Sequence, residues 1–493
     1  MKPLIAIAIL LLVLGASSCR KFLEEEPQGF LTTSQFYTSP NQIKAAVDGA
    51  YKGLELPFVS VFLGLPLNEF YAFESLTGFS TNDFGTGDGE KVYQRLDVID
   101  NQNPYLTNAY DAIYIPMENI NSVIANISGT DIIDEATKNQ YLGQLYFLRA
   151  YHYFRGVQLF GEIPLKTAPT EGIEDVTIPK ALIERNYAQM VTDLTQAENL
   201  GLPWTDATGH VSLGAVKTLL AKVYITMAGF PLNKGEEYYR MAYEKAAEVI
   251  SGGEFSLFSE YADLRNPANG NTGEHIFMIQ RQKVIANNEL HFAMLPSPGK
   301  TDPPISANNF FDPALRPTME FYNSYEQGDR RIEEGAFFYT YAPGEVMNYK
   351  YWDSDAAASP PSAAHIPRLR YADLLLLCAE AKANADGGST GDAVAVDAYY
   401  EVRKRAFPAE ARPASILVNQ VLKERFYEMA FEYHLWFDMI RTRKTLDVTS
   451  RQIVDLVGHK ATTHLRVFQE SDLLLPLPLM ETQRNSKLNE PAE

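Results

Sequence analysis

Apolar residues recur every three or four positions over most of this chain, and that spacing predicts long amphipathic helices. Gly and Pro mark the ends of several of these stretches, as Gly161 with Pro164 and Gly201 with Pro203 do. The predicted helices cover residues 41–55, 107–128, 138–160, 180–200, 212–228, 236–251, 370–385, 392–406 and 415–444.

Paired helices of this length, joined by short turns, predict a mainly α fold of tetratricopeptide-like helical hairpins, although no clean repeat of about 34 residues is visible. The helices form two blocks, residues 107–251 and 369–444. Residues 56–104 and 252–367 are instead rich in Gly, Pro, Asn and aromatic residues. Because long irregular segments in a compact body are usually functional, we expect these two segments to carry function. Residues 274–280 alternate weakly and predict a short strand.

The chain begins with an apolar run over residues 4–14, preceded by Lys2. As a helix this run would rise only about 16 Å, which is too short for a hydrocarbon core of about 30 Å, so it predicts a signal peptide. The sequence ASSC at residues 16–19 resembles a bacterial lipobox, in which cleavage precedes the Cys and the Cys is lipid-modified. An ordinary secretory signal that happens to precede a Cys is the alternative.

These features predict a signal peptide over residues 1–18, a lipidated Cys19 with a tether over residues 19–30, and a single body over residues 31–493. Since no other long apolar run occurs, we expect the body to be held at the membrane by lipid, such as palmitate, rather than to span it. The second cysteine, Cys378, lies in a Leu-rich stretch and is predicted to pack as a small buried hydrophobe.

Charge and composition narrow the function classes. The 43 Lys and Arg against 62 Asp and Glu give a formal charge of −19, which repels phosphate backbones and argues against nucleic-acid binding through a general basic surface. Aromatic residues make up 12% of the chain, with 28 Tyr, 27 Phe and only 3 Trp. This exceeds what a core of ordinary composition requires, so we expect part of the Tyr and Phe to contact a ligand.

Motifs for catalysis or metal binding are scarce. Residues 387–391 match G-x-S-x-G, but they follow a predicted helix rather than a strand, which predicts a helix-to-helix turn. No H-E-x-x-H, Walker loop or paired-Cys spacing occurs, so no cofactor or metal is predicted. The acidic, Gly-rich residues 83–90 do not match an EF-hand and predict a flexible loop. A glycosidase, which needs only two carboxylates, stays open as an alternative.

Several charged residues lie in predicted helices that are apolar almost all round. Arg149 and His152, in the middle of residues 138–160, are predicted to be an ion-paired arginine and a core histidine rather than catalytic groups. A further set is spaced by three or four residues, which predicts pairing along a helix. This set comprises Arg425, Glu428, Glu432, Asp438 and Arg441. Glu380, in the helix predicted over residues 370–385, is likewise expected to be a paired core charge rather than a catalytic group.

Characteristic motifs follow one another over essentially the whole mature chain. They are AAVDGAY (45–51), FLRAYHYFRGVQLFGEIPL (147–165), GHVSLGAVKTLLAKVYITMAG (209–229), YEQGDRR (325–331), LRYADLLLLCAEA (369–381), ERFYEMAFEYHLWFDMIR (424–441) and LLLPLP (473–478). In sequence and order these motifs resemble the SusD/RagB family of outer-membrane lipoproteins of Gram-negative bacteria. One departure is the ending EPAE, where many relatives end in Gly-Tyr.

The resemblance implies a helical body with four tetratricopeptide-like hairpins and a more irregular region that holds the ligand site. It also implies a non-catalytic protein outside the cell that captures a nutrient, usually an oligosaccharide, for a SusC-type TonB-dependent transporter. The helical side would contact the transporter and the loops the ligand. Some relatives serve peptide uptake, so peptide capture remains an alternative.

The candidate ligand contacts are aromatic and polar residues in the irregular segments. Sugar rings stack their C–H faces on aromatic rings, and sugar hydroxyls pair with planar polar groups. For each candidate, local packing or turn formation is the alternative role, and the motif at residues 147–165 is assigned to the fold. The candidates are Phe79, Asn82, Asp83 and Phe84 in the first segment, and Phe337, Tyr339, Tyr341 and Trp352 in the second.

Overall fold

The structure is a computed structural model that describes residues 36–58, 69–82, 88–286, 288, 290, 315–358 and 362–493. Contacts divide the chain into a unit that ends at Ala46 and a second unit from Val47 to Glu493. Helix α3 (Pro40–Tyr51) crosses this boundary in the sequence. The packing described below belongs to the second unit. The predicted signal peptide and Cys19 lie outside the described residues, so they and the domain boundaries stay predictions.

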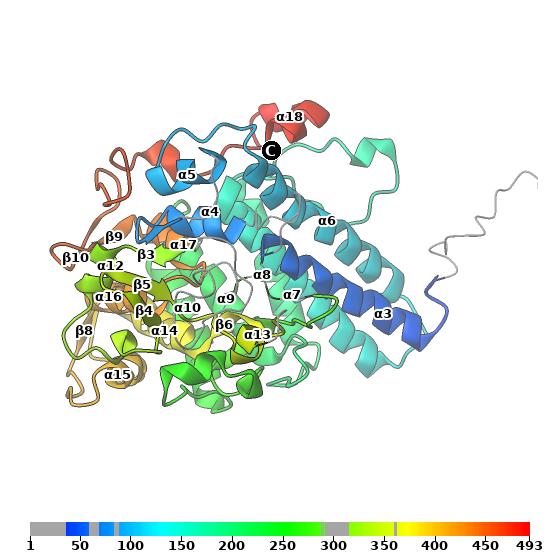
Figure 1. Ribbon diagram of the computed structural model, residues 1–493. Helices are drawn as coiled ribbons and strands as arrows, with labels where there is room; N and C mark the ends of the chain where they lie inside the picture. Colours follow the sequence, from blue (N-terminus) through cyan, green and yellow to red (C-terminus); the bar gives the residue numbers. More distant parts are fainter. Residues whose placement is uncertain are drawn as a thin grey trace, which may run out of the picture. The chain divides into compact units, whose positions relative to one another are not determined.

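Long α-helices make up much of the second unit (Figure 1), and polar caps fix where several of them begin. The side chains of Asn103, Asp134, Ser212 and Asp392 each accept a hydrogen bond from the first turn of the helix that follows. The main helices are α6 (Pro104–Ile127), α7 (Glu135–Phe160), α8 (Ile183–Glu198), α9 (Leu213–Ala228), α10 (Glu236–Gly252), α14 (Tyr371–Ala385), α15 (Ala393–Ala406), α16 (Val418–Glu428) and α17 (Leu435–Thr442).

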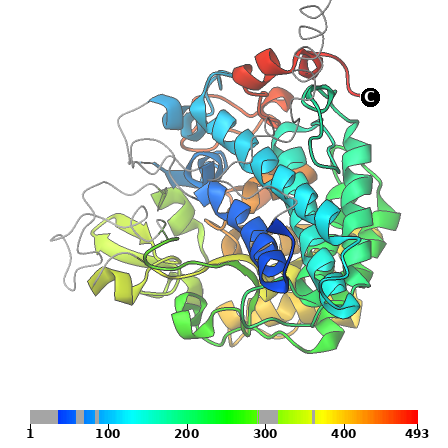
Figure 2. The same cartoon turned by 90° about the vertical axis from the view of Figure 1, so that its right-hand side faces the viewer.

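Consecutive helices pack against one another as hairpins. Contacts join α6 to α7, α7 to α8, α8 to α9 and α9 to α10, and later α14 to α15, while α10 also packs on α14. Figures 1 and 2 show several of these helices side by side. Their facing surfaces are apolar, with Leu145, Leu148 and Val216 among the fully buried residues. The predicted mainly α fold of tetratricopeptide-like hairpins is therefore confirmed.

The sequence between residues 415 and 444 does not form the single helix that its periodicity predicts. The chain breaks between α16 and α17, where Phe431 and Tyr433 adopt left-handed φ angles of 64° and 62°, a costly conformation for aromatic residues. The buried carboxylate of Glu74 holds this break, because it accepts hydrogen bonds from both backbone N–H groups, at 2.9 and 3.0 Å. Glu74 is 357 residues away from Phe431 in the sequence, so no local pattern could reveal it.

Short antiparallel strand pairs lie in and beside the irregular segments. Strand β2, which the alternation predicts, is buried along its length and pairs with β6, and β6 leads directly into α14. Strand β7 lies between α14 and α15, so the G-x-S-x-G match is a helix-to-helix turn, as predicted. The pairs are β1 (Ser80–Thr81) with β3 (Arg316–Pro317), β2 (His275–Ile279) with β6 (Ile366–Arg370), β4 (Phe338–Ala342) with β5 (Glu345–Asn348), β7 (Ser389–Thr390) with β8 (Ile416–Leu417), and β9 (Lys444–Asp447) with β10 (Gln452–Asp455).

Short helical turns fill the remaining connections of the described chain. They are η2 (Lys52–Phe58), α4 (Glu69–Ser75), α5 (Asp88–Arg95), η3 (Ile173–Asp175), η4 (Tyr261–Arg265), η5 (Pro267–Asn269), α12 (Met319–Ser324), η6 (Arg330–Ile332), α13 (Ser354–Ala358), η7 (Glu470–Asp472), α18 (Leu479–Arg484) and η8 (Ser486–Asn489). Among the helices of the described ranges, none is long and apolar enough to cross a membrane.

The buried charges of α7 behave as the sequence predicts. Arg149 bonds the carboxylate of Asp193 on α8 through Nε at 2.8 Å and Nη2 at 2.7 Å, which is a bidentate ion pair. His152 is fully buried, and burial lowers its pKa to about 3, so its ring is neutral at pH 7. Cys378 is likewise a buried free thiol, as predicted.

A larger group of buried charges connects segments that are distant in the sequence. Arg370 lies among the carboxylates of Glu274, Glu428 and Glu432, with its Nε 2.7 Å from Glu432. The prediction that Glu428 and Glu432 pair along their own helix is therefore wrong, because their partners come from other elements. We call this group the central ion-pair cluster; it comprises Glu274, Arg331, Arg370, Arg405, Glu424, Glu428 and Glu432.

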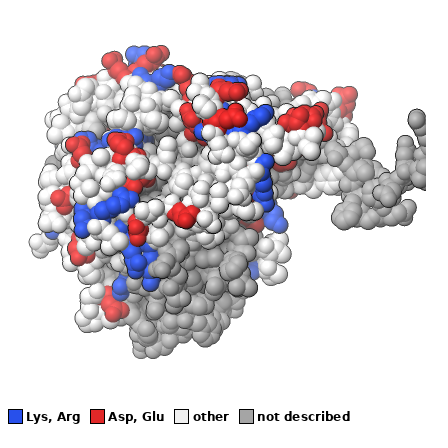
Figure 3. All heavy atoms as spheres, turned by 90° about the horizontal axis from the view of Figure 1, so that it is seen from above, with Lys and Arg blue, Asp and Glu red and all other residues white. Residues whose placement is uncertain are grey.

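Charge of both signs also covers part of the surface. On the face shown in Figure 3, the Lys and Arg of the described residues lie interspersed with Asp and Glu. The described residues contain no group of three or more His, Cys, Asp or Glu that could hold a metal ion. Residues 83–87 of the acidic loop lie outside the described ranges.

Candidate functional site

Three rings of the second irregular segment, those of Tyr339, Tyr349 and Trp352, form what we call the aromatic row. The ring centres of Tyr339 and Tyr349 are 5.3 Å apart with planes inclined by 28°, and those of Tyr349 and Trp352 are 5.0 Å apart with planes inclined by 18°. These are offset stacks, a favoured arrangement of aromatic side chains. Tyr349 is buried, with 8% of its surface exposed, whereas the two outer residues are half-buried. Each outer residue therefore keeps surface that a ligand can reach.

The β4–β5 hairpin and the turn after it place the row. Tyr339 lies on β4, and the turn to β5 contains Gly344 in the left-handed region, with a φ of 79°. The N–H of Tyr349 donates to the carbonyl of Phe337 at 2.8 Å, which continues the hairpin by one residue. The N–H of Trp352 then donates to the carbonyl of Tyr349 at 3.2 Å. This tight turn brings the second and third rings together.

Arg265, at the end of η4, packs its guanidinium against the row. The guanidinium carbon is 4.5 Å from the ring centre of Tyr349 and 5.8 Å from that of Trp352, within the range of cation–π attraction. Its nitrogens donate to the carbonyls of Gly335 and Ala336, at 2.6 and 3.1 Å. Burial lowers the pKa of Arg265, but its usual pKa is so high that it stays charged. Arg265 thus holds the row from one side, because its guanidinium contacts two ring faces and bonds two backbone carbonyls.

The hydroxyl of Tyr349 is a neutral group. Burial raises the pKa of Tyr349 to about 12, although the nearby Arg265 opposes the shift. At neutral pH the phenol therefore keeps its proton and can both donate and accept a hydrogen bond. This is the chemistry needed to pair with sugar hydroxyls.

A pocket adjoins Trp352 and presents planar polar groups. Its lining includes Arg265, Asn266, Asn288 and His365. Burial lowers the pKa of His365, and the nearby charge of Arg281 acts in the same direction, so the imidazole is neutral. Among the lining residues that the structure describes, none is Asp or Glu. The described lining thus combines an indole, amides, a guanidinium, the Lys350 ammonium and a neutral imidazole, which can form hydrogen bonds with an uncharged polyhydroxyl ligand.

The structure brings two of the candidate ligand contacts together and shows that others are buried. Tyr339 and Trp352 both belong to the aromatic row. Phe337 is 1% exposed, with the Lys350 ammonium 3.7 Å from its ring centre, and it therefore packs inside. Phe79 is 2% exposed, with its ring centre 4.6 Å from that of Phe321. These two phenylalanines have the packing role that was the alternative, because buried rings offer no face to a ligand.

The remaining candidates do not join the row. Asn82 is buried, at 3% exposed, and its backbone N–H donates to Gln94 at 2.9 Å. Tyr341 lies on β4, and the position of its side chain is outside what the structure describes. Asp83 and Phe84 also lie outside the described residues. A ligand role for these residues therefore stays a prediction.

Sequence reasoning missed Tyr349 and Arg265. Tyr349 begins the aromatic-rich run YKYW at residues 349–352, so the composition of this run was a usable signal. Arg265 lies in a different part of the irregular segment, on η4, and its position under the row depends on tertiary packing. No local pattern could have singled it out.

Comparison with known proteins finds relatives that align with almost the whole chain. A sequence model of the SusD family matches residues 280–492, and a model described as "Starch-binding associating with outer membrane" matches residues 63–225. The SusD-like protein P25 of Formosa agariphila is 26% identical over an alignment of 532 positions, which covers 98% of this chain and 97% of the relative.

Solved structures agree with these sequence matches. A SusD superfamily protein from Parabacteroides distasonis is 32% identical, with a TM-score of 0.83, over 93% of this chain and 99% of that one. Surface glycan-binding protein A from Bacteroides thetaiotaomicron, solved in complex with laminarihexaose, shares the fold with a TM-score of 0.72 at 19% identity, over 90% of this chain and 98% of that one. With matches along its whole length and a helical-hairpin fold, this chain belongs to the SusD/RagB family.

Proposed function

We propose that this protein captures an oligosaccharide at the outside of the cell and passes it to a SusC-type TonB-dependent transporter. The observation that carries this proposal is the aromatic row, in which Tyr339 and Trp352 stay half-buried on either side of the buried Tyr349. Apolar C–H faces of sugar rings pack on such rings, and the adjoining pocket supplies amide and guanidinium donors for hydroxyl groups.

Relatives with the same fold support a sugar as the ligand class. The Bacteroides thetaiotaomicron relative binds laminarihexaose in its solved complex, and another neighbour is described as a laminarin-binding SusD-like protein. The pocket beside Trp352 presents amide, guanidinium and imidazole groups, which can form hydrogen bonds with the hydroxyls of an uncharged sugar. Peptide capture by the same architecture is the alternative outcome of the test below.

The proposed role is binding without catalysis. Hydrolysis of a glycosidic bond generally uses a pair of Asp or Glu residues on either side of the bond. The residues that line the pocket provide an indole, amides and cationic or neutral nitrogen groups instead. A ligand held there would be retained and released rather than cleaved.

The proposed location is the outer membrane, with the chain anchored by lipid on Cys19. The lipobox-like ASSC at residues 16–19 supports this anchor, and the family description "associating with outer membrane" fits the location. A tethered binding protein raises the ligand concentration beside a transporter in the same membrane. We therefore propose the transporter as the partner that receives the ligand.

The experiment is affinity electrophoresis of the purified body against gels that contain single neutral polysaccharides, followed by calorimetry with the matching oligosaccharide. We expect retardation by at least one polysaccharide and loss of that retardation in Trp352→Ala. Trp204→Ala is the matched control, because Trp204 is also half-buried but lies in the segment before α9. Binding of peptides with no retardation by any polysaccharide would contradict the proposal, as would release of shorter sugars during the assay.

A further inference from the structure

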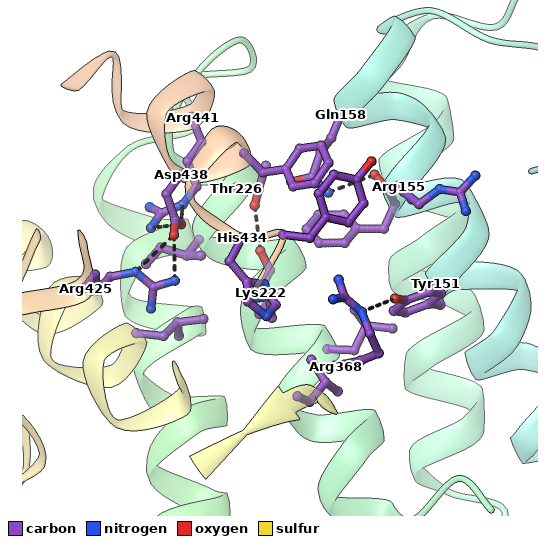
Figure 4. Close-up of a pocket in the computed structure, with 17 residues that line it drawn as sticks. Tyr151, Arg155, Gln158, Lys222, Thr226, Arg368, Arg425, His434, Asp438 and Arg441 are labelled. Carbon is purple, nitrogen blue, oxygen red and sulfur yellow. Dashed lines mark hydrogen bonds and ion pairs between the residues drawn. The ribbon is translucent and has the colours of Figure 1, made fainter. Parts of the chain in front are cut away.

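A second pocket lies in the helical body, between α7, α9, α17 and the end of β6 (Figure 4). We call it the arginine pocket because four arginines line it, namely Arg155, Arg368, Arg425 and Arg441. Lys222, His434 and Asp438 belong to the same lining. Four of its lining residues, Tyr151, Gln158, Lys222 and Phe437, are only half-buried, so solvent can reach it. The space is small, enough for an ion and a few waters.

Most of the positive charge in this pocket is already balanced. Lys222 lies 2.6 Å from Asp373, and Arg425 lies 2.8 Å from both Asp373 and Asp438. Arg441 pairs with Asp438 at 2.7 Å along α17, as its spacing predicts. Arg441 also pairs with Glu380 of α14, so three cations meet three carboxylates in this network. The network needs no further ion.

Arg368 is not part of this network. It is 6% exposed, yet no carboxylate of the described residues forms an ion pair with it. Its Nε donates to the hydroxyl of Tyr151 at 3.0 Å, and its Nη1 donates to the backbone carbonyl of Glu432, also at 3.0 Å. Nη2 makes no hydrogen bond to a described residue. The guanidinium carbon also lies 5.2 Å from the ring centre of Phe58 and 5.7 Å from that of Tyr433, so ring faces share its charge. No carboxylate of a described residue is paired with it, so this position favours an anion.

His434 provides a second, independent observation. It is 7% exposed, and its Nε2 has no hydrogen-bond partner among the described residues. Burial keeps the pKa of His434 well below its usual range, and the charges of Lys222 and Arg368 act in the same direction. Asp373 and Glu432 oppose this shift without outweighing it. The ring is therefore neutral, and an N–H at Nε2 would be a free donor at the pocket wall.

We propose that the arginine pocket binds a small inorganic anion of the chloride type. Arg368 supplies a charge that no described carboxylate pairs with and an Nη2 that bonds no described residue, and His434 supplies a neutral N–H donor, while Lys222 adds a nearby positive charge. The anion takes the place of the carboxylate that Arg368 lacks and joins β6, the start of α17 and α9 through one bound charge. This site is separate from the aromatic row, so the proposal of an anion site does not depend on glycan binding.

The test uses bromide, which resembles chloride and can be located by its anomalous scattering. Crystals of the protein soaked in sodium bromide should show an anomalous peak in the pocket, in contact with Nη2 of Arg368 and Nε2 of His434. No peak in the pocket would overturn the proposal. This arm needs only the unsubstituted protein, so it does not depend on how any variant folds.

A second arm follows thermal unfolding at constant ionic strength while chloride replaces a bulky organic sulfonate. A ligand that binds the folded state raises the midpoint temperature as its concentration rises. Arg368→Gln should need roughly tenfold more chloride for the same rise, because a charge-assisted hydrogen bond is lost. Arg443→Gln is the control, since Arg443 also bonds a backbone carbonyl, that of Ile440, outside the pocket. Equal chloride dependence in Arg368→Gln and the unsubstituted protein would overturn the proposal.

Discussion

The central ion-pair cluster and the aromatic row both hold arginines against partners from distant segments, but they differ in how much of their surface is exposed to solvent. In the cluster, Arg370 is surrounded by the carboxylates of Glu274, Glu428 and Glu432, and all four are buried. In the row, Arg265 meets ring faces and carbonyls, and the outer rings stay half-buried. Charges that satisfy one another close a region to ligands, whereas stacked rings that stay half-buried leave surface that a ligand can reach.

The two regions are joined through one lysine. Lys350 lies between Tyr349 and Tyr351 in the sequence, and its Nζ bonds Glu432 at 2.6 Å and the carbonyl of Glu428 at 2.8 Å. The buried cluster therefore anchors the segment that carries the row. Substitution of Arg370 or Glu432 disrupts the cluster, whereas substitution of Trp352 or Phe337 tests the row and the core beside it separately.

Loss of a central cation should have the largest effect. Arg370→Met leaves three carboxylates without their shared partner, and breaking a buried ion pair in this way costs about 3–5 kcal/mol. The free energy of unfolding, measured by urea denaturation, should fall by that amount. Arg412→Met, which removes an exposed pair with Asp397, should leave the free energy of unfolding almost unchanged. Similar losses in the two variants would contradict the assigned role of the cluster.

The cluster should also make the protein unstable in acid. Burial alone would raise the pKa of Glu432, but Arg370 and Lys350 lower it from 4.5 to about 2. Because the folded-state pKa is lowered, the stabilisation is complete above the unfolded pKa and disappears as the pH falls from about 4.5 to about 2. We expect a loss on the order of 2–3 kcal/mol from this group, measured by urea denaturation at a series of pH values.

Glu432→Gln tests the source of this acid sensitivity. The amide cannot titrate, so the variant should be less stable at pH 7 but should lose less stability between pH 4.5 and 2. Asp397→Asn, at an exposed position, should keep the pH profile of the unsubstituted protein. An unchanged profile in Glu432→Gln would assign the acid sensitivity to other carboxylates.

Truncation in the row should act on binding rather than on folding. Trp352→Ala should weaken oligosaccharide binding by about 1–3 kcal/mol, by analogy with the stacking of bases on aromatic side chains. Isothermal titration calorimetry gives this value directly. Since Trp352 is only half-buried, urea denaturation should show a smaller loss than Arg370→Met causes. A variant that unfolds but binds normally in its folded fraction would place the ligand elsewhere.

Phe337 marks the boundary between the row and the core and should show the smallest effect. Phe337→Leu keeps an apolar side chain in a site that is 1% exposed, so stability should fall by roughly 1 kcal/mol. Oligosaccharide affinity should stay unchanged, because the ring has no exposed face. Weaker binding with unchanged stability would show that the sequence-based choice of Phe337 as a ligand contact was correct.

Local patterns in the sequence predicted the helices well and tertiary contacts poorly. Apolar spacing and caps such as Ser212 and Asp392 define helix positions over short distances. The break between α16 and α17 depends instead on Glu74, 357 residues from Phe431. Pairing along a helix holds for Asp438 and Arg441, but Glu428 takes its partners from other elements.

The same limit applies to the candidate site. Aromatic content in an irregular segment singled out Tyr339 and Trp352, which the structure places in one stacked row, while their ligand role stays a prediction. It could not separate them from Phe337, since all three lie near the same hairpin and burial is decided by what packs on them. Arg265 depends wholly on tertiary packing, and its contact with the row is visible only in the fold.

The most direct test is a crystal structure of the protein with the oligosaccharide that affinity electrophoresis identifies. A sugar ring should lie against Trp352 or Tyr339, with its hydroxyls bonded to polar groups of the adjoining pocket, such as Asn266 or Arg265. The central ion-pair cluster should be unchanged. An oligosaccharide bound elsewhere, with the aromatic row free of ligand, would contradict the account.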